Sequence, residues 1–296
     1  MEISYIDRKT GQRCIEKVYG HKALSFLYGD GFFRSLILRL LAHIPFFSHL
    51  YGHLQKRPAS AAKIKPFIKA YHVDETEFAE TRFRSFNDFF IRKLKPEKRP
   101  IASDPTLLSM PADGRYLAYP QFNDFVIKGK NFSLPTFLCN TAFANRYSTG
   151  SMLIARLCPT DYHRFHFPCD GLPSKAQLIN GPLYSVNPIA LKKRLEILSE
   201  NKRMITEIET ERFGTMLYIE IGATSVGSIH QTYTPDQPIR KGQEKGYFEF
   251  GGSCLVLLFE KDAITFDRDL ILNTQKGLET RANFGEPFAK CKAALH

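Results

Sequence analysis

The 296-residue sequence lacks the patterns that mark several large classes of protein. Its six cysteines form no C-x-x-C pair, which excludes a zinc ribbon or a dithiol redox motif, and their spacing suggests no disulfide framework. We therefore expect a reducing, cytoplasmic environment. The N-terminal segment MEISYIDRKTGQRC contains no apolar signal-peptide core.

Long uninterrupted apolar runs are also absent. The most apolar region, residues 32–54, is broken by Arg34, Arg39, His43 and Pro45. A membrane-spanning helix needs about 20 mostly apolar residues with few charges, so a spanning helix is excluded. The pattern instead predicts two short amphipathic helices separated near Pro45, whose apolar faces belong either to the core or to a membrane interface.

The positive charge is concentrated in one part of the chain. The net charge is +11, and residues 1–100 hold 19 Lys and Arg against 10 Asp and Glu. Such an excess suits a nucleic acid or an anionic membrane surface, and a solvated basic face without a partner is the alternative. Because no nucleic-acid-binding motif accompanies the charge, we expect no nucleic-acid partner.

The N-terminal third is predicted to be mostly helical. Residues 1–20 indicate a short hairpin with a turn at residues 10–11, and residues 22–95 have helical spacing. Ser85 followed by Asp88 resembles an N-terminal capping pattern. This basic, helical region, residues 1–100, is expected to form one unit.

After residue 100 the pattern changes to short strands bounded by Gly, Pro and Asp, and a single helix is predicted over residues 188–201. The clearest strand segments are 151–159, 218–223 and 253–260. The sequence therefore predicts an α+β fold, in which the helical N-terminal region packs on a β-rich catalytic domain formed by residues 101–296.

Two polar segments carry candidate chemistry. Asp113 lies in SMPADGRY, residues 109–116, where a surface turn is the simplest interpretation. His163 and His166 lie in CPTDYHRFHFPCDG, residues 158–171, which we expect to be an irregular loop. The two histidines are either structural or half of a metal site, but no acidic or His cluster completes one, so we expect no metal.

A third segment contains the run Gly251-Gly252-Ser253 before a strongly apolar strand. A Gly-rich turn leading into a buried strand is the simplest interpretation. The run is neither a phosphate-binding Walker loop nor a G-x-S-x-G elbow. A serine beside glycine is little shielded, however, and is therefore accessible as a nucleophile.

The three segments together supply the residue types of a catalytic triad. Ser253 is the candidate nucleophile, His166 the candidate base and Asp113 the candidate orienter, because such groups can meet from distant positions. On residues alone, two other functions remain open. One is a triad hydrolase acting on lipids with an intact chain, and the other is a basic nucleic-acid module, which the lack of a recognisable motif disfavours.

The same segments resemble the phosphatidylserine decarboxylase proenzyme family. The resemblance covers most of residues 83–288, and its pieces occur in the family's order. They are FRSFNDFFIRKLKPEKRP, MPADGR, RLCPTDYHRFHFPCDG, ERFG, KGQEKGYFEFGGS and GLETRANFGEPF. The DYHRFHFP run together with the GGS site is highly specific.

The resemblance implies that the chain cuts itself between Gly252 and Ser253. The products are a β chain, 1–252, and an α chain, 253–296. Asp113 and His166 match the charge relay of self-cleavage. His163 matches a second histidine that serves substrate binding or decarboxylation.

The implied chemistry explains why these residue types are needed. Ser253 Oγ, deprotonated by His166, attacks the Gly252 carbonyl and converts the peptide into an ester. Loss of the α-proton of residue 253 then expels the Gly252 carboxylate and leaves dehydroalanine, which hydrolyses to a pyruvoyl group and ammonia. This covalent pyruvate cofactor forms a Schiff base with phosphatidylserine, releases CO₂ and yields phosphatidylethanolamine.

One residue departs from the family pattern. Cys254 stands where the family usually has Thr. A thiol is also a nucleophile, but Cys254 leads an apolar strand, so we expect a small buried side chain that does not perform the cleavage.

An anionic lipid substrate gives the basic N-terminal region a use. Amphipathic helices over residues 22–56 suit peripheral binding to the cytoplasmic side of the cell membrane, and packing on the catalytic domain alone is the alternative. The basic residues concerned are Arg34, Arg39, Lys56, Arg57, Lys63, Lys65 and Lys69. The expected partners are phosphatidylserine in the membrane and the two chains of one precursor, and the sequence leaves a homodimer open.

Overall fold

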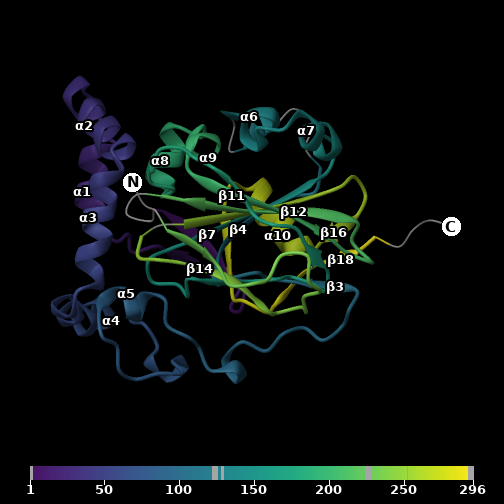
Figure 1. The fold of residues 1–296 in the computed structure, drawn as a ribbon, viewed down its shortest axis with the longest axis horizontal. Helices are drawn as coiled ribbons and strands as arrows, with labels where there is room; N and C mark the ends of the chain where they lie inside the picture. The colour runs from purple at the N-terminus through teal and green to yellow at the C-terminus, as the bar shows by residue number, and fades with distance from the viewer. Residues whose placement is uncertain (1–2, 122–125, 128–129, 224–227, 252, 293–296) are drawn as a thin grey trace.

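A large antiparallel sheet forms the centre of the molecule (Figure 1). The structure, a computed structural model, describes residues 3–121, 126–127, 130–223, 228–251 and 253–292. Across the sheet the strands are β10 (Gln177–Ile179), β11 (Arg203–Glu209), β12 (Thr215–Gly222), β15 (Ser253–Phe259), β7 (Ser151–Leu157), β4 (Gly114–Tyr119), β17 (Glu279–Ala282), β1 (Ser4–Asp7) and β2 (Arg13–Ile15), with β9 (Leu172–Pro173) paired to β11. The pair β1–β17 is parallel.

The strand β15 lies in the middle of this sheet, between β12 and β7. All of its residues are buried, because both of its faces are covered. Successive side chains of a strand point to opposite faces. Accordingly Val256 and Leu258 belong to one apolar cluster, and Leu255 and Leu257 belong to another.

Short helices cover one face of the sheet and smaller sheets cover the other (Figure 1). The helices are α6 (Leu134–Leu138), α7 (Thr141–Tyr147), α8 (Pro188–Lys193) and α9 (Ile197–Glu200). The opposite face carries β13 (Ile229–Gln231), β14 (Glu244–Phe248) and β8 (Arg164–His166), then β16 (Ile264–Phe266), β18 (Pro287–Cys291) and β3 (Leu107–Ser109), and α10 (Arg268–Gln275). A separate pair is β5 (Val126–Ile127) with β6 (Lys130–Asn131).

The N-terminal helices stand beside one end of the sheet (Figure 1). They are α1 (His21–Leu27), α2 (Phe32–His43), α3 (Pro45–Lys56), α4 (Ile64–Tyr71) and α5 (Phe86–Phe90), with 3-10 turns at Pro58–Lys63, Glu75–Glu77 and Pro96–Lys98. Ile44 is extended between α2 and α3, and Pro45 occupies the first turn of α3. The break predicted near Pro45 is therefore confirmed. Among the described residues, no helix combines the length and the hydropathy that crossing a bilayer requires.

Most of the local predictions are confirmed. The α+β class is correct, and the N-terminal hairpin forms as β1 and β2, with Gly11 at φ +68° in its turn. Ser85 caps α5 by accepting the Asp88 N–H at 3.1 Å.

The single helix predicted over residues 188–201 is wrong. The segment forms two short helices, α8 and α9, because Arg194 adopts an extended backbone. Its guanidinium instead bonds Glu200 at 2.7 Å and lies 4.9 Å from the Tyr184 ring.

Candidate active site

Ser253 is the first residue of the central strand β15. Its backbone faces Gly222 of β12 on one side and Leu157 of β7 on the other. The side chain is 0% exposed, and its hydroxyl has no hydrogen-bond partner among the residues that the structure describes. Leaving a buried hydroxyl unpaired costs about 1–3 kcal/mol, so such a group in a native fold calls for a functional explanation.

The segment before Ser253 is held in a conformation that suits glycine. Gly251 is buried and has φ +146°, a region that side chains disfavour. The predicted cleavage residue Gly252 lies outside the described residues. The position of the predicted scissile bond therefore follows from its neighbours Gly251 and Ser253.

His163 is the histidine that the structure places against this segment. Its ring is 0% exposed, and Nδ1 lies 3.0 Å from the Asp161 carbonyl oxygen. Burial lowers the pKa of His163 to about 4, partly opposed by the backbone of Asp161 and of Gly251. The imidazole is therefore neutral at pH 7. Because the Asp161 carbonyl requires a proton on Nδ1, the lone pair is on Nε2, for which the described part of the chain offers no hydrogen-bond partner.

His166 ends β8 and lies in a different environment. Its ring stacks on Phe284, with ring centroids 3.7 Å apart, and no described residue forms a hydrogen bond with its Nδ1. Burial lowers the pKa of His166 to about 3, and the Arg164 cation adds to this effect. His166 is thus also neutral. No hydrogen bond joins its ring to Ser253 or Asp113 within the described part of the chain.

Asp113 is buried, so a simple surface turn is the wrong interpretation of its segment. Its carboxylate accepts from Arg99 Nε at 2.9 Å and Nη2 at 2.6 Å, and from the Phe284 N–H at 2.8 Å. Phe284 therefore touches both partners, Asp113 through its backbone and His166 through its ring. The structure brings Asp113 and His166 together around Phe284, and brings His163 to Gly251.

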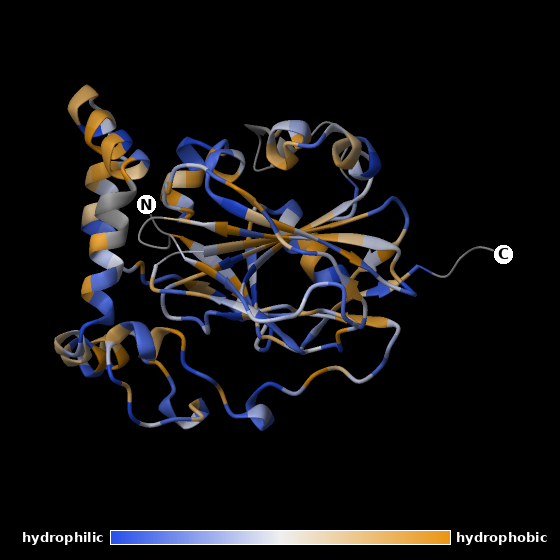
Figure 2. Ribbon diagram, in the orientation of Figure 1, coloured by the Kyte–Doolittle hydropathy of each residue, from blue (hydrophilic) through white to orange (hydrophobic). Residues whose placement is uncertain are grey.

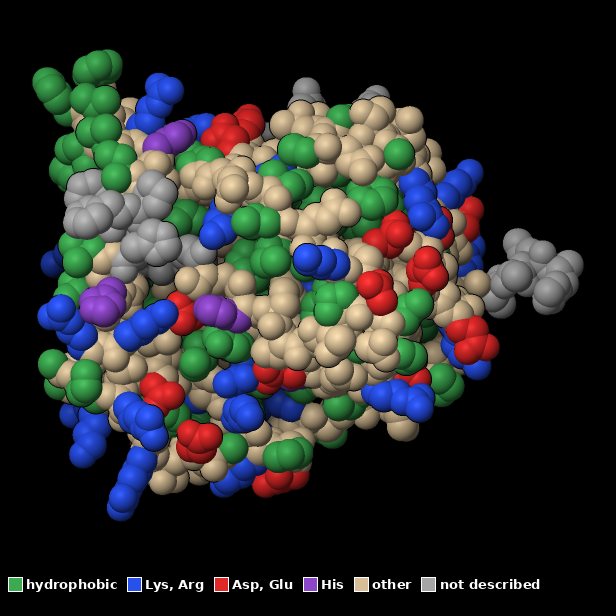
Figure 3. Space-filling view, viewed as in Figure 1, with side chains coloured by type: hydrophobic (Ala, Val, Ile, Leu, Met, Phe, Trp, Pro, Cys, Tyr) green, Lys and Arg blue, Asp and Glu red, His purple; other side chains and the backbone are tan. Residues whose placement is uncertain are grey.

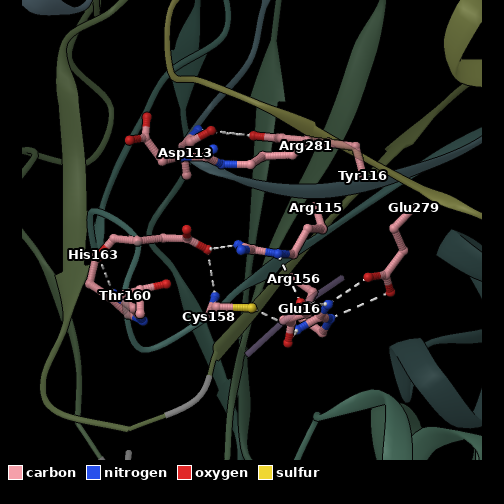
Figure 4. A network of polar contacts seen from close by, with 12 residues as sticks. Glu16, Asp113, Arg115, Tyr116, Arg156, Cys158, Thr160, His163, Glu279 and Arg281 are labelled. Carbon is pink, nitrogen blue, oxygen red and sulfur yellow. Dashed lines mark hydrogen bonds and ion pairs between the residues drawn. The ribbon is translucent and has the colours of Figure 1, made fainter. Parts of the chain in front are cut away.

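Charged side chains that the sequence interpretation missed lie beside this site (Figure 4). Arg156 of β7 bonds Glu279 at 2.5 Å and Glu16 at 2.7 Å. Arg115 of β4 pairs with Glu16 at 2.9 Å and with Asp161. All five side chains are buried. The signal in the sequence is the presence of arginines inside otherwise apolar strands, where an unpaired charge would be costly.

Two cavities adjoin the site. An apolar cavity of about 230 Å³ is bordered by α1, by Tyr51 of α3 and by the pair Phe250 and Gly251. A polar cavity of about 410 Å³ is bordered by Asp113 and Arg99. Both cavities are bordered by Glu16, Lys17 and Thr160, so they meet near the start of the segment that carries His163.

Phe250, at the edge of the apolar cavity, is fixed by N-terminal residues. Its N–H donates to Asn87 Oδ1 at 2.9 Å, and its ring lies 5.0–6.0 Å from four aromatic rings. These rings belong to Tyr19, Tyr51, Phe86 and Phe90. The helical region therefore holds the chain just before the predicted cleavage site.

Cys254 is 1% exposed and belongs to the apolar cluster under the helices. Because alternate side chains of a strand point to opposite faces, its thiol lies on the other face of β15 from the Ser253 hydroxyl. The expectation of a small buried side chain is confirmed.

Comparisons with known proteins agree on one family. A model of the phosphatidylserine decarboxylase family matches residues 86–290, beginning at the first residue of α5. The phosphatidylserine decarboxylase proenzyme of Chlamydia pneumoniae is 47% identical over 291 residues, which cover 97% of this chain and 96% of that protein. The proenzymes of Chlamydia caviae and Chlamydia trachomatis are 47% and 43% identical, over 98% of this chain. The chain belongs to the phosphatidylserine decarboxylase family, and is a carboxy-lyase of phospholipid synthesis made as a proenzyme.

Proposed function

We propose that the chain cuts itself between Gly252 and Ser253 and that residue 253 becomes a pyruvoyl group. The observation that carries the proposal is the Ser253 hydroxyl at the start of β15, two residues after Gly251, which is buried and has no hydrogen-bond partner among the described residues. The proenzyme name of the relatives is consistent with processing into two chains. When formed, the pyruvoyl group supplies an electron sink for the electron pair that decarboxylation leaves on the substrate.

The residues around position 253 fit such a group. Gly222 and Leu157 pair with the strand start on both sides and fix it, while the apolar cavity reaches Gly251 from the surface. Electrostatic effects are strong in such an enclosed site, because little water screens them.

For self-cleavage we assign the attack to Ser253 Oγ, the proton acceptor to His166 and the orienting carboxylate to Asp113. The low pKa of His166 keeps its imidazole neutral, so a ring nitrogen has a lone pair for the Ser253 proton, which the ring then holds only weakly. The contacts of Phe284 with both His166 and Asp113 support their acting as one unit.

For decarboxylation we assign the proton transfers to His163. Its neutral ring has an Nε2 lone pair with no hydrogen-bond partner among the described residues, which can receive the proton that the substrate's ammonium group must lose, and its low pKa makes it release that proton readily. The same proton is then available for the substrate carbon after CO₂ departs. His163 therefore accepts one proton and later donates it, and returns to its neutral state at the end of both transfers.

The cleavage proposal is tested by gel electrophoresis and intact mass measurement. The wild-type chain should give two fragments, the smaller one blocked at its N-terminus. Ser253→Ala should remain a single 33.9 kDa species, whereas Cys254→Ala should be cut normally, since its thiol lies on the other face of β15. Efficient cleavage of Ser253→Ala, or of Ser253→Ala combined with Cys254→Ala, would contradict the assignment of Ser253 as the nucleophile.

We also propose that α1, α2 and α3 seat the enzyme on the surface of an anionic membrane. Phe32 and Phe33 at the start of α2 are 78% and 77% exposed. Figure 2 shows hydrophobic residues along α2, at the upper left of the view. Figure 3 shows hydrophobic side chains gathered at this upper left edge, and several Lys and Arg side chains at the lower left, towards α4 and α5. The exposed apolar side chains of this region include Phe26, Phe32, Phe33, Leu36, Ile37, Leu40, Ile44, Leu50, Tyr51 and Leu54.

This exposed apolar surface adjoins the apolar cavity that leads to the site. Helix α1 and Tyr51 of α3 also border the apolar cavity that reaches Gly251. A lipid whose chains stay in the bilayer therefore needs to raise only its headgroup into the cavity. Inserting each phenylalanine is worth about 1.5–3 kcal/mol, so the pair matters strongly to binding.

Liposome flotation tests the membrane proposal. Deleting residues 1–60 is unsuitable, because it removes β1, β2 and the buried Glu16. The double variant Phe32→Ser, Phe33→Ser alters only exposed side chains and should lose at least tenfold in binding to phosphatidylserine vesicles. Leu272→Ser on α10, also exposed, is the matched control and should float normally. Equal flotation of all three proteins would defeat the proposal.

A further inference from the structure

Arg92 is a buried cation that the steps assigned above do not use. It follows α5 and is only 5% exposed. Its guanidinium lies 5.1 Å from the Phe78 ring centroid and 4.8 Å from that of Phe89. Burial lowers the pKa of Arg92 to about 10, so it stays charged at neutral pH. No carboxylate among the described residues forms an ion pair with it, although a buried charge without such a partner is costly.

The donors of Arg92 are directed at backbone carbonyl groups. Nη2 lies 3.2 Å from the Thr160 oxygen and 3.4 Å from the Asp161 oxygen, and Nη1 lies 3.4 Å from the Phe89 oxygen. The Asp161 oxygen is the same atom that lies 3.0 Å from His163 Nδ1. Arg92 and His163 therefore share one acceptor.

The segment that carries this acceptor is held from the other side as well. The Asp161 carboxylate pairs with Arg115 and accepts the Cys158 N–H at 2.7 Å. Asp161 is thus held by two arginines, by Arg115 through its carboxylate and by Arg92 through its carbonyl. The position of the His163 ring follows from that carbonyl and from the Phe90 ring, whose centroid lies 3.9 Å away.

We propose that Arg92 is a positioning residue for His163. By holding the Asp161 carbonyl it keeps the proton of the imidazole on Nδ1, and by its charge it disfavours a second proton, so that Nε2 presents a lone pair to the segment before Ser253. The charged or polar groups that face His163 are Arg92 after α5, Asp161 on its own segment and the Gly251 backbone. The inference rests on the proposed function of His163 in decarboxylation.

The direct test is an NMR titration of His163 in the Ser253→Ala background, which keeps the chain in one piece and needs no cofactor. Arg92→Met should raise the pKa of His163 by about one unit, because an adjacent cation is removed. Arg92→Lys keeps the charge and should leave that pKa nearly unchanged. Arg164→Met is the matched control, since Arg164 acts on His166 and binds Glu244 and the Ile91 carbonyl.

The activity test uses the processed enzyme. Arg92→Met should move the acid limb of the kcat/KM profile for decarboxylation upward by about one pH unit, a nearly tenfold loss on the acid side. Arg92→Lys should lower kcat at all pH values without moving the limb, because an ammonium group cannot bridge both carbonyls as the planar guanidinium does.

The outcomes separate this inference from the proposed function. An unchanged His163 pKa in a folded Arg92→Met protein overturns the role of Arg92, whatever the activity shows. A shifted pKa with an unmoved kcat/KM profile upholds the electrostatic link but removes His163 from decarboxylation. If Arg92→Met does not fold, Arg92→Lys provides the test. A shift of the acid limb of its kcat/KM profile would then overturn the inference.

Discussion

Replacing Asp113 with Asn separates the structural role of its carboxylate from the catalytic role that we propose for it. The side chain accepts two bonds from Arg99 and one from the Phe284 backbone, and it is proposed to orient His166. Asn keeps the shape but removes the charge and leaves Arg99 with Glu77 as its carboxylate partner. Breaking such a buried pair costs about 3–5 kcal/mol of folding stability.

The rate effect is predicted to be much larger than this loss can explain. General base catalysis contributes about 10²–10⁴-fold, so Asp113→Asn should slow self-cleavage by about that factor among molecules that are still folded. Arg99→Met is the matched control. It breaks the same ion pair but retains the carboxylate, so its folded fraction should cut within about tenfold of the wild-type rate.

The assay follows fragment formation by gel after rapid refolding, with urea unfolding to measure the folded fraction. Self-cleavage of Asp113→Asn at nearly the wild-type rate would refute the orienting role. Equal slowing of Asp113→Asn and Arg99→Met would show that the ion pair, and not the orientation of His166, is what matters.

Two further predictions concern buried charges. Lys245 and Glu220 pair at 2.6 Å inside the core, where both side chains are 0% exposed, and burial raises the pKa of Glu220 and lowers that of Lys245. Lys245→Met should therefore lower the free energy of unfolding in urea by about 3–5 kcal/mol, whereas the double variant Lys245→Met, Glu220→Leu should be nearly as stable as the wild type. A double variant whose loss equals the sum of the two single losses would contradict this. His163 and His166 have folded pKa values of about 4 and about 3, below an unfolded value of 6.5, so the unfolded chain binds more protons and stability falls as the pH drops from 6.5. By pH 5, above most carboxylate titration, each histidine should cost about 2 kcal/mol of stability, and a flat urea midpoint between pH 6.5 and 5 in Ser253→Ala would exclude neutral buried histidines.

The sequence predicted the elements whose pattern is local. The helix break at Pro45, the cap at Ser85 and the strands around residues 151–159 and 253–260 all follow from residue type and spacing, and the structure has them. Residues 188–201 were mistaken because the break at Arg194 depends on contacts with Glu200 and Tyr184, which spacing does not encode.

The site was predictable only in part. Asp113, His163, His166 and Ser253 were found through family motifs, but which histidine lies against Gly251 is decided by how β8 and β14 pair, a long-range feature. The buried arginines were missed for the same reason. An arginine such as Arg156 can only be understood once the distant carboxylates that neutralise it are known.

The order of strands in the sheet has a consequence for the life of the enzyme. Of the strands that would belong to the small fragment, β15 lies between β12 and β7, and β17 lies between β4 and β1. The two products of the proposed cut would therefore be interwoven, and the small one could not leave without breaking strand pairs on both of its sides. A molecule whose proposed pyruvoyl group was destroyed could then not exchange its small chain for a new one without unfolding the centre of the sheet. On this proposal the enzyme is replaced only by new synthesis, and its working lifetime is that of a group made once from its own backbone.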